Sequence, residues 1–206
     1  MAYPTISKPY GFKPINLIGG QVFAGSTRKM RIASAYGTAI GYGDLLVKVN
    51  DGTVARSGAT NAKPTGGFAG VFLGCEFINP TTGQLQFQQN FPASLTVSSG
   101  VITAYVCDDP DALFQVAVVS GTTVVTGVQY TSVGENATIV NNTAITASGN
   151  SQVALLASTA TTDTLPIRIV DVVPDTAYES GGDILYPEVI VKINFGMHAY
   201  DTAVGV

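Results

Sequence analysis

The chain has 206 residues, of which 46% are hydrophobic and only 12% are charged, and its formal net charge is −4. A typical soluble protein is about 25% charged, and a disordered chain combines low hydrophobicity with high net charge, so this composition excludes a disordered protein. The ten Lys and Arg residues are scattered, with one dense run at Arg28-Lys29-Met30-Arg31. Nucleic-acid-binding proteins usually carry a larger basic patch than this single run. We therefore expect the run to serve solubility or a local contact and not to bind nucleic acid.

The first 25 residues combine prolines with aromatic residues, in the order MAYPTISKPYGFKP at the start. Proline fixes φ and lacks an N–H donor, so this spacing excludes a helix or a central strand. We predict an extended N-terminal arm over residues 1–25, which lies across a neighbouring subunit or across its own domain. We also expect the remaining β-rich domain, residues 26–206, to fold without residues 1–14. The arm residues predicted to contact a partner are Tyr3, Pro4, Pro9, Tyr10, Phe12 and Pro14.

Short strands follow the arm. Residues 29–34 and 44–50 have strand-like patterns, and the second run ends in Asn50-Asp51-Gly52. Asp-Gly is a strong signal for a tight hairpin turn, so residues 53–56 are expected to pair back onto 44–50. Residues 57–67 are small and polar, which is typical of a surface loop.

A hairpin is predicted over residues 68–91. Residues 68–78 are apolar, residues 79–83 contain Pro80 and Gly83 and favour a turn, and residues 84–91 alternate between apolar and polar side chains. This period of two predicts a strand that places Leu85 and Phe87 on the core and turns a polar face outward. A neutral amide face can bind another chain without desolvating charges. The predicted contact residues on that face are Gln84, Gln86 and Gln88.

The second half of the chain also predicts strands, at residues 101–107, 113–120, 124–130, 137–140, 165–173 and 189–195. Residues 151–159 fit a strand or one short helix, and residues 174–187 are expected to form a loop. Short strands at intervals of about ten residues, without an amphipathic helix, favour an all-β fold. We predict an antiparallel β-sandwich or barrel, jelly-roll or β-tulip-like, with a possible subdomain change near Gly121, where the composition shifts.

Few residues point to chemistry. His198 is the only histidine, and one histidine with two distant cysteines predicts neither a catalytic triad nor a zinc site. The cluster of Asp108, Asp109 and Asp111 fits a capped turn, with a cation site as the alternative. We therefore expect no enzyme activity, no catalytic residue, no cofactor and no metal.

The two cysteines, Cys75 and Cys107, both lie in apolar strand-like runs. We expect buried free thiols in a protein made in a reducing cytosol, with a disulfide between adjacent strands as the alternative. No apolar run approaches 18 residues, and the N-terminal segment lacks an apolar core, so we expect neither a membrane span nor a secretory signal.

Several segments carry a resemblance to a known class of protein. They are residues 8–20 (KPYGFKPINLIGG), 72–76 (FLGCE), 79–84 (NPTTGQ), 104–110 (AYVCDDP) and 186–196 (YPEVIVKINFG), with His198 and Tyr200. Together they resemble structural proteins of tailed bacteriophages, particularly phages of aquatic bacteria. Within that class the chain most resembles a capsid cement (decoration) protein.

The resemblance implies a β-rich subunit that sits as a homotrimer on the outer surface of the icosahedral head. There it would clamp the major capsid protein, with no direct contact to nucleic acid or membrane. It implies a location in the virion after synthesis in the cytoplasm of the host bacterium. Two alternatives stay open: another virion component, such as a head fibre, neck or tail protein, and a host-glycan-binding β-sandwich. The absence of Trp argues against the glycan-binding alternative.

Overall fold

The computed structural model describes residues 6–97, 99–122, 124–176, 178–180 and 183–206. The chain is all-β, as predicted, and the only helical elements in these ranges are two short 3-10 turns, η1 (Tyr130–Ser132) and η2 (Pro174–Thr176). No helix in the described part of the chain is long and apolar enough to cross a membrane. The strands are β1 (Lys13–Leu17), β2 (Arg28–Ile32), β3 (Leu45–Lys48), β4 (Thr53–Arg56), β5 (Phe68–Ile78), β6 (Leu85–Gln88), β7 (Ile102–Cys107), β8 (Ala112–Val119), β9 (Val128–Gln129), β10 (Asn136–Val140), β11 (Ala154–Ala160), β12 (Ile167–Val172), β13 (Tyr178–Ser180), β14 (Asp183–Tyr186) and β15 (Glu188–Ile193).

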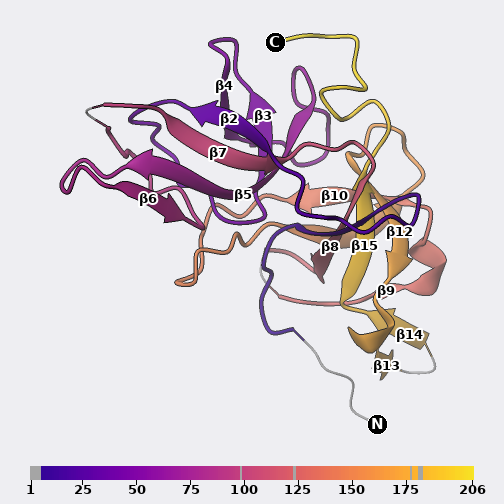
Figure 1. Ribbon diagram of the computed structural model, residues 1–206. Coiled ribbons are helices and arrows are strands. Elements are labelled where there is room, and N and C mark those ends of the chain that lie inside the picture. The colour runs from indigo at the N-terminus through magenta and orange to yellow at the C-terminus, as the bar shows by residue number, and fades with distance from the viewer. Residues whose placement is uncertain (1–5, 98, 123, 177, 181–182) are drawn as a thin grey trace.

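The two large sheets each close on themselves, which gives two barrel-like units (Figure 1). In the first barrel the strands follow the order β3-β4-β2-β7-β5, and β5 pairs again with β3. In the second barrel the order is β8-β11-β10-β12-β15, and β15 pairs again with β8. One strand is added outside each ring, β6 on β5 and β1 on β8. Most pairs are antiparallel, as predicted, but β2–β4 and β8–β11 are parallel.

The first barrel closes at β5, because one edge of this strand pairs with two different strands along its length. The first part of β5 pairs with β3 and its last part pairs with β6, while β7 lies along the opposite edge. The ladder between β5 and β7 is irregular at Phe72/Gly74, and such irregularities increase local twist. Gly70 has φ +138°, and a Cβ there would lie 2.2 Å from the carbonyl oxygen of Cys107. The tight crossing of β5 and β7 therefore requires glycine at this position.

The boundary between the two barrels lies in the acidic turn between β7 and β8, because β7 ends at Cys107 and β8 begins at Ala112. Gly121, near which the sequence predicted a subdomain change, lies after β8 of the second barrel and before β9 of the small three-stranded sheet. The shift in composition there reflects polar loops between β8 and β10. This segment also contains β9, which belongs to the small sheet with β13 and β14, before the chain returns to the second barrel at β10.

The buried residues form two core clusters, and β5 contributes to both. Along β5, Ala69 and Phe72 are buried inside the first barrel, whereas Phe68 and Val71 belong to the core cluster that contains Phe114 of the second barrel. The members of each pair are three residues apart, because the register between β3 and β5 shifts at Leu46/Val47, opposite Gly70 and Phe68. On either side of this irregularity successive residues point to opposite faces, so β5 contributes to both cores. One cluster contains Phe68 and Val71 of the first barrel together with Phe114 of the second, so it packs the two barrels against each other.

The N-terminal segment is integrated into the second barrel from Pro9 onward, and residues 1–5, with Tyr3 and Pro4, lie outside the described part of the chain. Pro9 is buried, and Phe12 is fully buried against Phe114, with ring centroids 6.1 Å apart. Pro14 lies in β1, where a missing N–H is tolerated because β1 is a terminal strand of its sheet. The assignment of Phe12 as a partner contact is therefore wrong, because its ring is a core side chain of its own chain. Removing residues 1–14 would remove that core residue, so the expectation that the domain folds without them is also corrected.

For two further segments, the structure decides between two predicted alternatives in one and corrects a predicted loop in the other. Residues 151–159, which fitted a strand or a helix, contribute to strand β11. Residues 174–187, predicted as a loop, contain η2 and the hairpin of β13 and β14, which pairs with β9 in a small three-stranded sheet.

Candidate functional site

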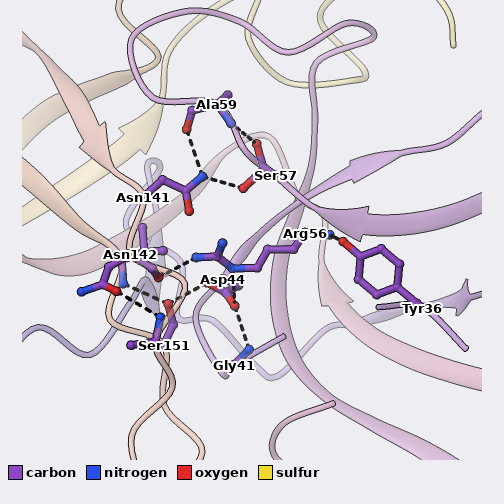
Figure 2. A network of polar contacts seen from close by, with 11 residues as sticks. Tyr36, Gly41, Asp44, Arg56, Ser57, Ala59, Asn141, Asn142 and Ser151 are labelled. Carbon is purple, nitrogen blue, oxygen red and sulfur yellow. Dashed lines mark hydrogen bonds and ion pairs between the residues drawn. The ribbon is translucent and has the colours of Figure 1, made fainter. Parts of the chain in front are cut away.

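A buried ion pair lies where the two barrels meet (Figure 2). Arg56 Nε, at the end of β4, lies 3.0 Å from Asp44 Oδ2, just before β3, and the side chains are only 5% and 1% exposed. Figure 2 shows both side chains directed toward the loop between β10 and β11, which belongs to the second barrel. A charge pair withdrawn from water in this way needs further hydrogen bonds to be tolerated.

The loop of the second barrel supplies those hydrogen bonds. Ser151 Oγ donates to Asp44 Oδ1 over 2.7 Å, and Arg56 Nη2 donates to the carbonyl of Asn142 over 2.6 Å. The backbone N–H of Gly41 donates to Asp44 Oδ2 over 2.7 Å. A Cβ on Gly41 would lie 2.7 Å from the backbone nitrogen of Ser151, so glycine allows the two barrels to approach this closely. The network is a polar clamp between barrels, and its geometry supports a structural role.

The face of β6 is the reverse of the prediction. Leu85 and Phe87 are 60% and 63% exposed, although their alternation predicted a core face. The register explains this: Gln86 lies opposite Phe77 and Gln88 opposite Cys75, both buried in the first barrel. Directly opposed residues of antiparallel strands share a face, so the glutamines are carried to the core side and the apolar residues outward. We call the exposed Leu85 and Phe87 the β6 outer face.

No charged residue occurs in the sequence from residue 77 to residue 107, but Glu76 of β5 lies directly opposite Phe87 on the same face, where it pairs with Lys29 over 2.8 Å. β6 is a terminal strand of its sheet, and Figure 1 places it at the left of the view. Just after its end, Gln89 Nε2 donates to Asn150 Oδ1 of the second barrel over 2.6 Å. Proteins usually protect such edges with charges, prolines or bulges, and the four residue pairs of β5 and β6 are in regular register. Exposed apolar side chains on an unprotected edge indicate a surface for another chain.

The remaining predicted contact residues are spread over two regions. Gln84 is exposed, whereas Gln86 and Gln88 are half-buried, and Asn79 Nδ2 donates to Gln86 Oε1 over 2.9 Å. Tyr10 is half-buried, and its hydroxyl donates to the buried Glu188 over 2.5 Å. Burial, together with this hydrogen bond, raises the pKa of Tyr10 far above its ordinary value. The structure thus places the glutamines beside the first barrel and Tyr10 on the second.

The basic run forms part of a hollow of about 540 Å³ beside β2 and β4, lined by Arg28, Lys29, Arg31, Lys48 and Tyr200 among others. Two of these cations have local partners: Arg28 pairs with Asp108, and Lys29 Nζ lies 2.8 Å from Glu76 Oε1. Lys48 Nζ lies 4.5 Å from the centroid of the Tyr200 ring. Sequence reasoning did not connect Lys48 and Tyr200 to this run, because neither is near it in the chain.

The acidic turn forms local contacts of its own. Asp109 Oδ1 accepts from the backbone N–H of Asp111 over 2.8 Å, as in a capped turn. Asp108 accepts from the Tyr200 hydroxyl over 2.8 Å and pairs with Arg28, and Asp111 pairs with Lys192. Among the described residues, no group of three or more His, Cys, Asp or Glu is arranged to hold a metal ion. The capped-turn interpretation therefore accounts for this cluster.

Comparison with protein-family models, with curated proteins and with solved structures finds no match to this chain. The fold defines the class as an all-β protein of two joined barrel-like sheets. Its most distinctive surface is the β6 outer face, where Leu85 and Phe87 are exposed beside the paired Glu76.

Proposed function

We propose that this chain is a capsid cement (decoration) protein of a tailed bacteriophage. It binds as a homotrimer to the outer surface of the head and stabilises the lattice of the major capsid protein against the pressure of packed DNA. A protein that binds only the expanded lattice stabilises that state by mass action, and several linked subunits add avidity. The phage setting and the trimer rest on the sequence resemblance.

The observation that carries the proposal is the β6 outer face. Leu85 and Phe87 stand exposed on an edge strand within 31 consecutive residues that bear no charge. Exposed apolar side chains on an edge strand add buried area in an assembly, and the neighbouring Glu76 already has a partner in Lys29. An assembly also covers the edge that would otherwise invite aggregation.

The test is cryo-EM of purified particles that contain the chain, with its copies counted and placed on the lattice. A cement protein is present in hundreds of copies at equivalent positions over the whole head. About a dozen copies confined to one vertex, or density only in fibres, would instead assign the chain to a neck, tail or fibre component.

A binding experiment connects the proposal to β6. The double variant L85S/F87S should lose binding to heads that lack the protein, while V124S, which changes an apolar residue that is 66% exposed on the second barrel, should bind as wild type. Equal binding by the double variant and wild type would show that the β6 outer face is not the contact surface.

A further inference from the structure

Two neighbouring hollows lie at the junction of the barrels and are both lined by Tyr42. The first, of about 350 Å³, is bordered by Tyr10, Gln115, Asn150 and Glu188. The second, of about 480 Å³, is bordered by Phe87, Gln89 and Tyr105. Gln89 Nε2 donates to Asn150 Oδ1 over 2.6 Å, which connects the walls of the two hollows. We call the two hollows together the junction groove.

We infer that the junction groove binds a neutral oligosaccharide. Four aromatic rings, those of Tyr10, Tyr42, Phe87 and Tyr105, line it along its length. The C–H face of a sugar ring is apolar, and flat aromatic side chains offer a large contact area at a low cost in conformational entropy. These tyrosines and this phenylalanine take the place of the tryptophan that the chain lacks.

The polar side chains of the groove match the chemistry of hydroxyl groups. Amide groups such as those of Gln115 and Asn150 donate and accept hydrogen bonds, as does a sugar hydroxyl. Glu188 supplies a carboxylate acceptor, which is fixed in place because Tyr10 and Gln115 donate to its Oε1 over 2.5 and 3.2 Å. Lys13 adds one donor with a positive charge.

This set of groups favours a sugar over a proline-rich peptide, which also docks in aromatic grooves. A proline residue has a carbonyl acceptor and no N–H donor, so it offers nothing to the carboxylate of Glu188. Lys13 and Glu188 are the two ionisable side chains of opposite formal charge among the lining residues of the first hollow. Their charges balance, so the groove favours a ligand without net charge.

The groove is held in shape before a ligand arrives. The backbone N–H of Tyr42 donates to the carbonyl of Gly149 over 2.9 Å, and its carbonyl accepts from the N–H of Ser151 over 2.9 Å. Tyr42 is therefore fixed between the barrels, next to the polar clamp that Asp44 and Ser151 form. A preformed site loses little conformational entropy on binding.

The experiment uses the full chain in native gels that contain dextran, galactomannan or xyloglucan, with alginate and poly-L-proline as competing classes. We expect at least one of the three neutral polysaccharides to retard the protein. Tyr42→Ala should weaken that retardation about tenfold, the loss expected for one stacked ring with its packing. The matched control Tyr130→Ala removes a ring that is 59% exposed in η1, beside the small three-stranded sheet, and should stay within about twofold of wild type.

Four outcomes would overturn the inference: no retardation by any of the neutral polysaccharides, retardation by alginate alone, retardation by poly-L-proline alone, or equal retardation of wild type and Tyr42→Ala. If Tyr42→Ala lowers the unfolding temperature, Gln89→Ala replaces it, because Gln89 is exposed and its side chain contributes only one hydrogen bond to the groove. The result is independent of the proposed capsid role, because it is measured on the isolated protein and the variants leave Phe87 unchanged.

Discussion

Asp44 and Arg56 form an ion pair that is almost completely withdrawn from water, with 3.0 Å between Asp44 Oδ2 and Arg56 Nε. Ser151 and Asn142, from the other barrel, add hydrogen bonds to Asp44 and to Arg56 Nη2, while Arg56 Nε makes the ion pair but no hydrogen bond of regular geometry among the described residues. The pair therefore couples the packing of one barrel to that of the other, and its loss should be felt in the stability of the whole chain.

Arg56→Met should lower the free energy of unfolding by about 3–5 kcal/mol, because it leaves the Asp44 carboxylate buried without its partner. Urea denaturation followed by circular dichroism measures this change. The matched control is Lys192→Met, which breaks the more exposed pair with Asp111 and should cost no more than about 1 kcal/mol. Similar losses in both variants would contradict the role assigned to the clamp.

Phe12→Ala should destabilise the chain by about 3–5 kcal/mol, since it removes a fully buried ring that packs edge-on against Phe114. Lys8→Ala, four residues earlier at an exposed position, should have little effect. Thermal unfolding of the two variants side by side distinguishes them. If Phe12→Ala were as stable as Lys8→Ala, residues before β1 would be a detachable arm after all.

Local patterns predicted the first barrel well. The apolar run of β5 was located with its observed ends, and the Asp51-Gly52 turn correctly joined β3 to β4. The faces of β6 were not predictable in the same way, because alternation shows that two faces exist and only the partner strand decides which is buried. Here Gln88 pairs with the buried Cys75 of β5 and Gln86 with the buried Phe77, and this register places the glutamines on the core side.

The candidate site was less accessible to sequence reasoning than the strands. The clamp joins Asp44 to Ser151, and the junction groove joins Tyr42 to Tyr10 and Glu188, over separations that no periodic pattern records. Pro9, Phe12 and Pro14 suggested an arm because proline excludes regular central strands. A terminal strand such as β1 also tolerates proline, because one of its edges forms no strand pair. The packing of Phe12 in the core favours this strand over a free arm.

Cys75 and Cys107 should stay unreactive in the folded protein. They lie on adjacent strands but in different core clusters, on opposite faces of the sheet, and both are free. Burial raises the pKa of Cys75 to about 12 and that of Cys107 to about 11. At pH 8 at most about one Cys107 thiol in a thousand is therefore the reactive thiolate.

A thiol-reactive disulfide reagent should accordingly label neither cysteine of the native protein within minutes at pH 8. The same reagent should label both in concentrated guanidinium chloride, which serves as the control for intact thiols. Rapid labelling of one thiol under native conditions would show that its strand opens locally or that the thiol is accessible.

His198 should make the protein less stable as the pH falls below about 6.5. Its ring is 1% exposed, and Nδ1 accepts from the backbone N–H of Tyr200 over 3.2 Å. Burial lowers the pKa of His198, although nearby Asp201 and Asp108 act in the opposite direction. Because Nδ1 accepts this bond, the neutral ring carries its proton on Nε2, which has no hydrogen-bond partner among the described residues. A second proton would have to bind to Nδ1 and would break the bond from Tyr200.

The sign follows from proton linkage. Below about pH 6.5 the unfolded chain binds a proton at His198 that the folded chain does not take up until a lower pH, so the free energy of unfolding falls as the pH falls. The stabilisation is fully present above about pH 6.5, and the slope is at most about 1.4 kcal/mol per pH unit for one proton. His198 is the only histidine, and unfolded carboxyl groups titrate near pH 4, so the window from about pH 5 to 6.5 reports on this residue.

Urea unfolding at a series of pH values tests this in wild type and His198→Asn, whose amide oxygen can still accept from the Tyr200 N–H. The variant should show a flat profile from about pH 5 to 6.5 and the same decline as wild type below that range, where carboxyl groups dominate. An unchanged slope in the variant would assign the pH dependence to another group and contradict a neutral, buried His198.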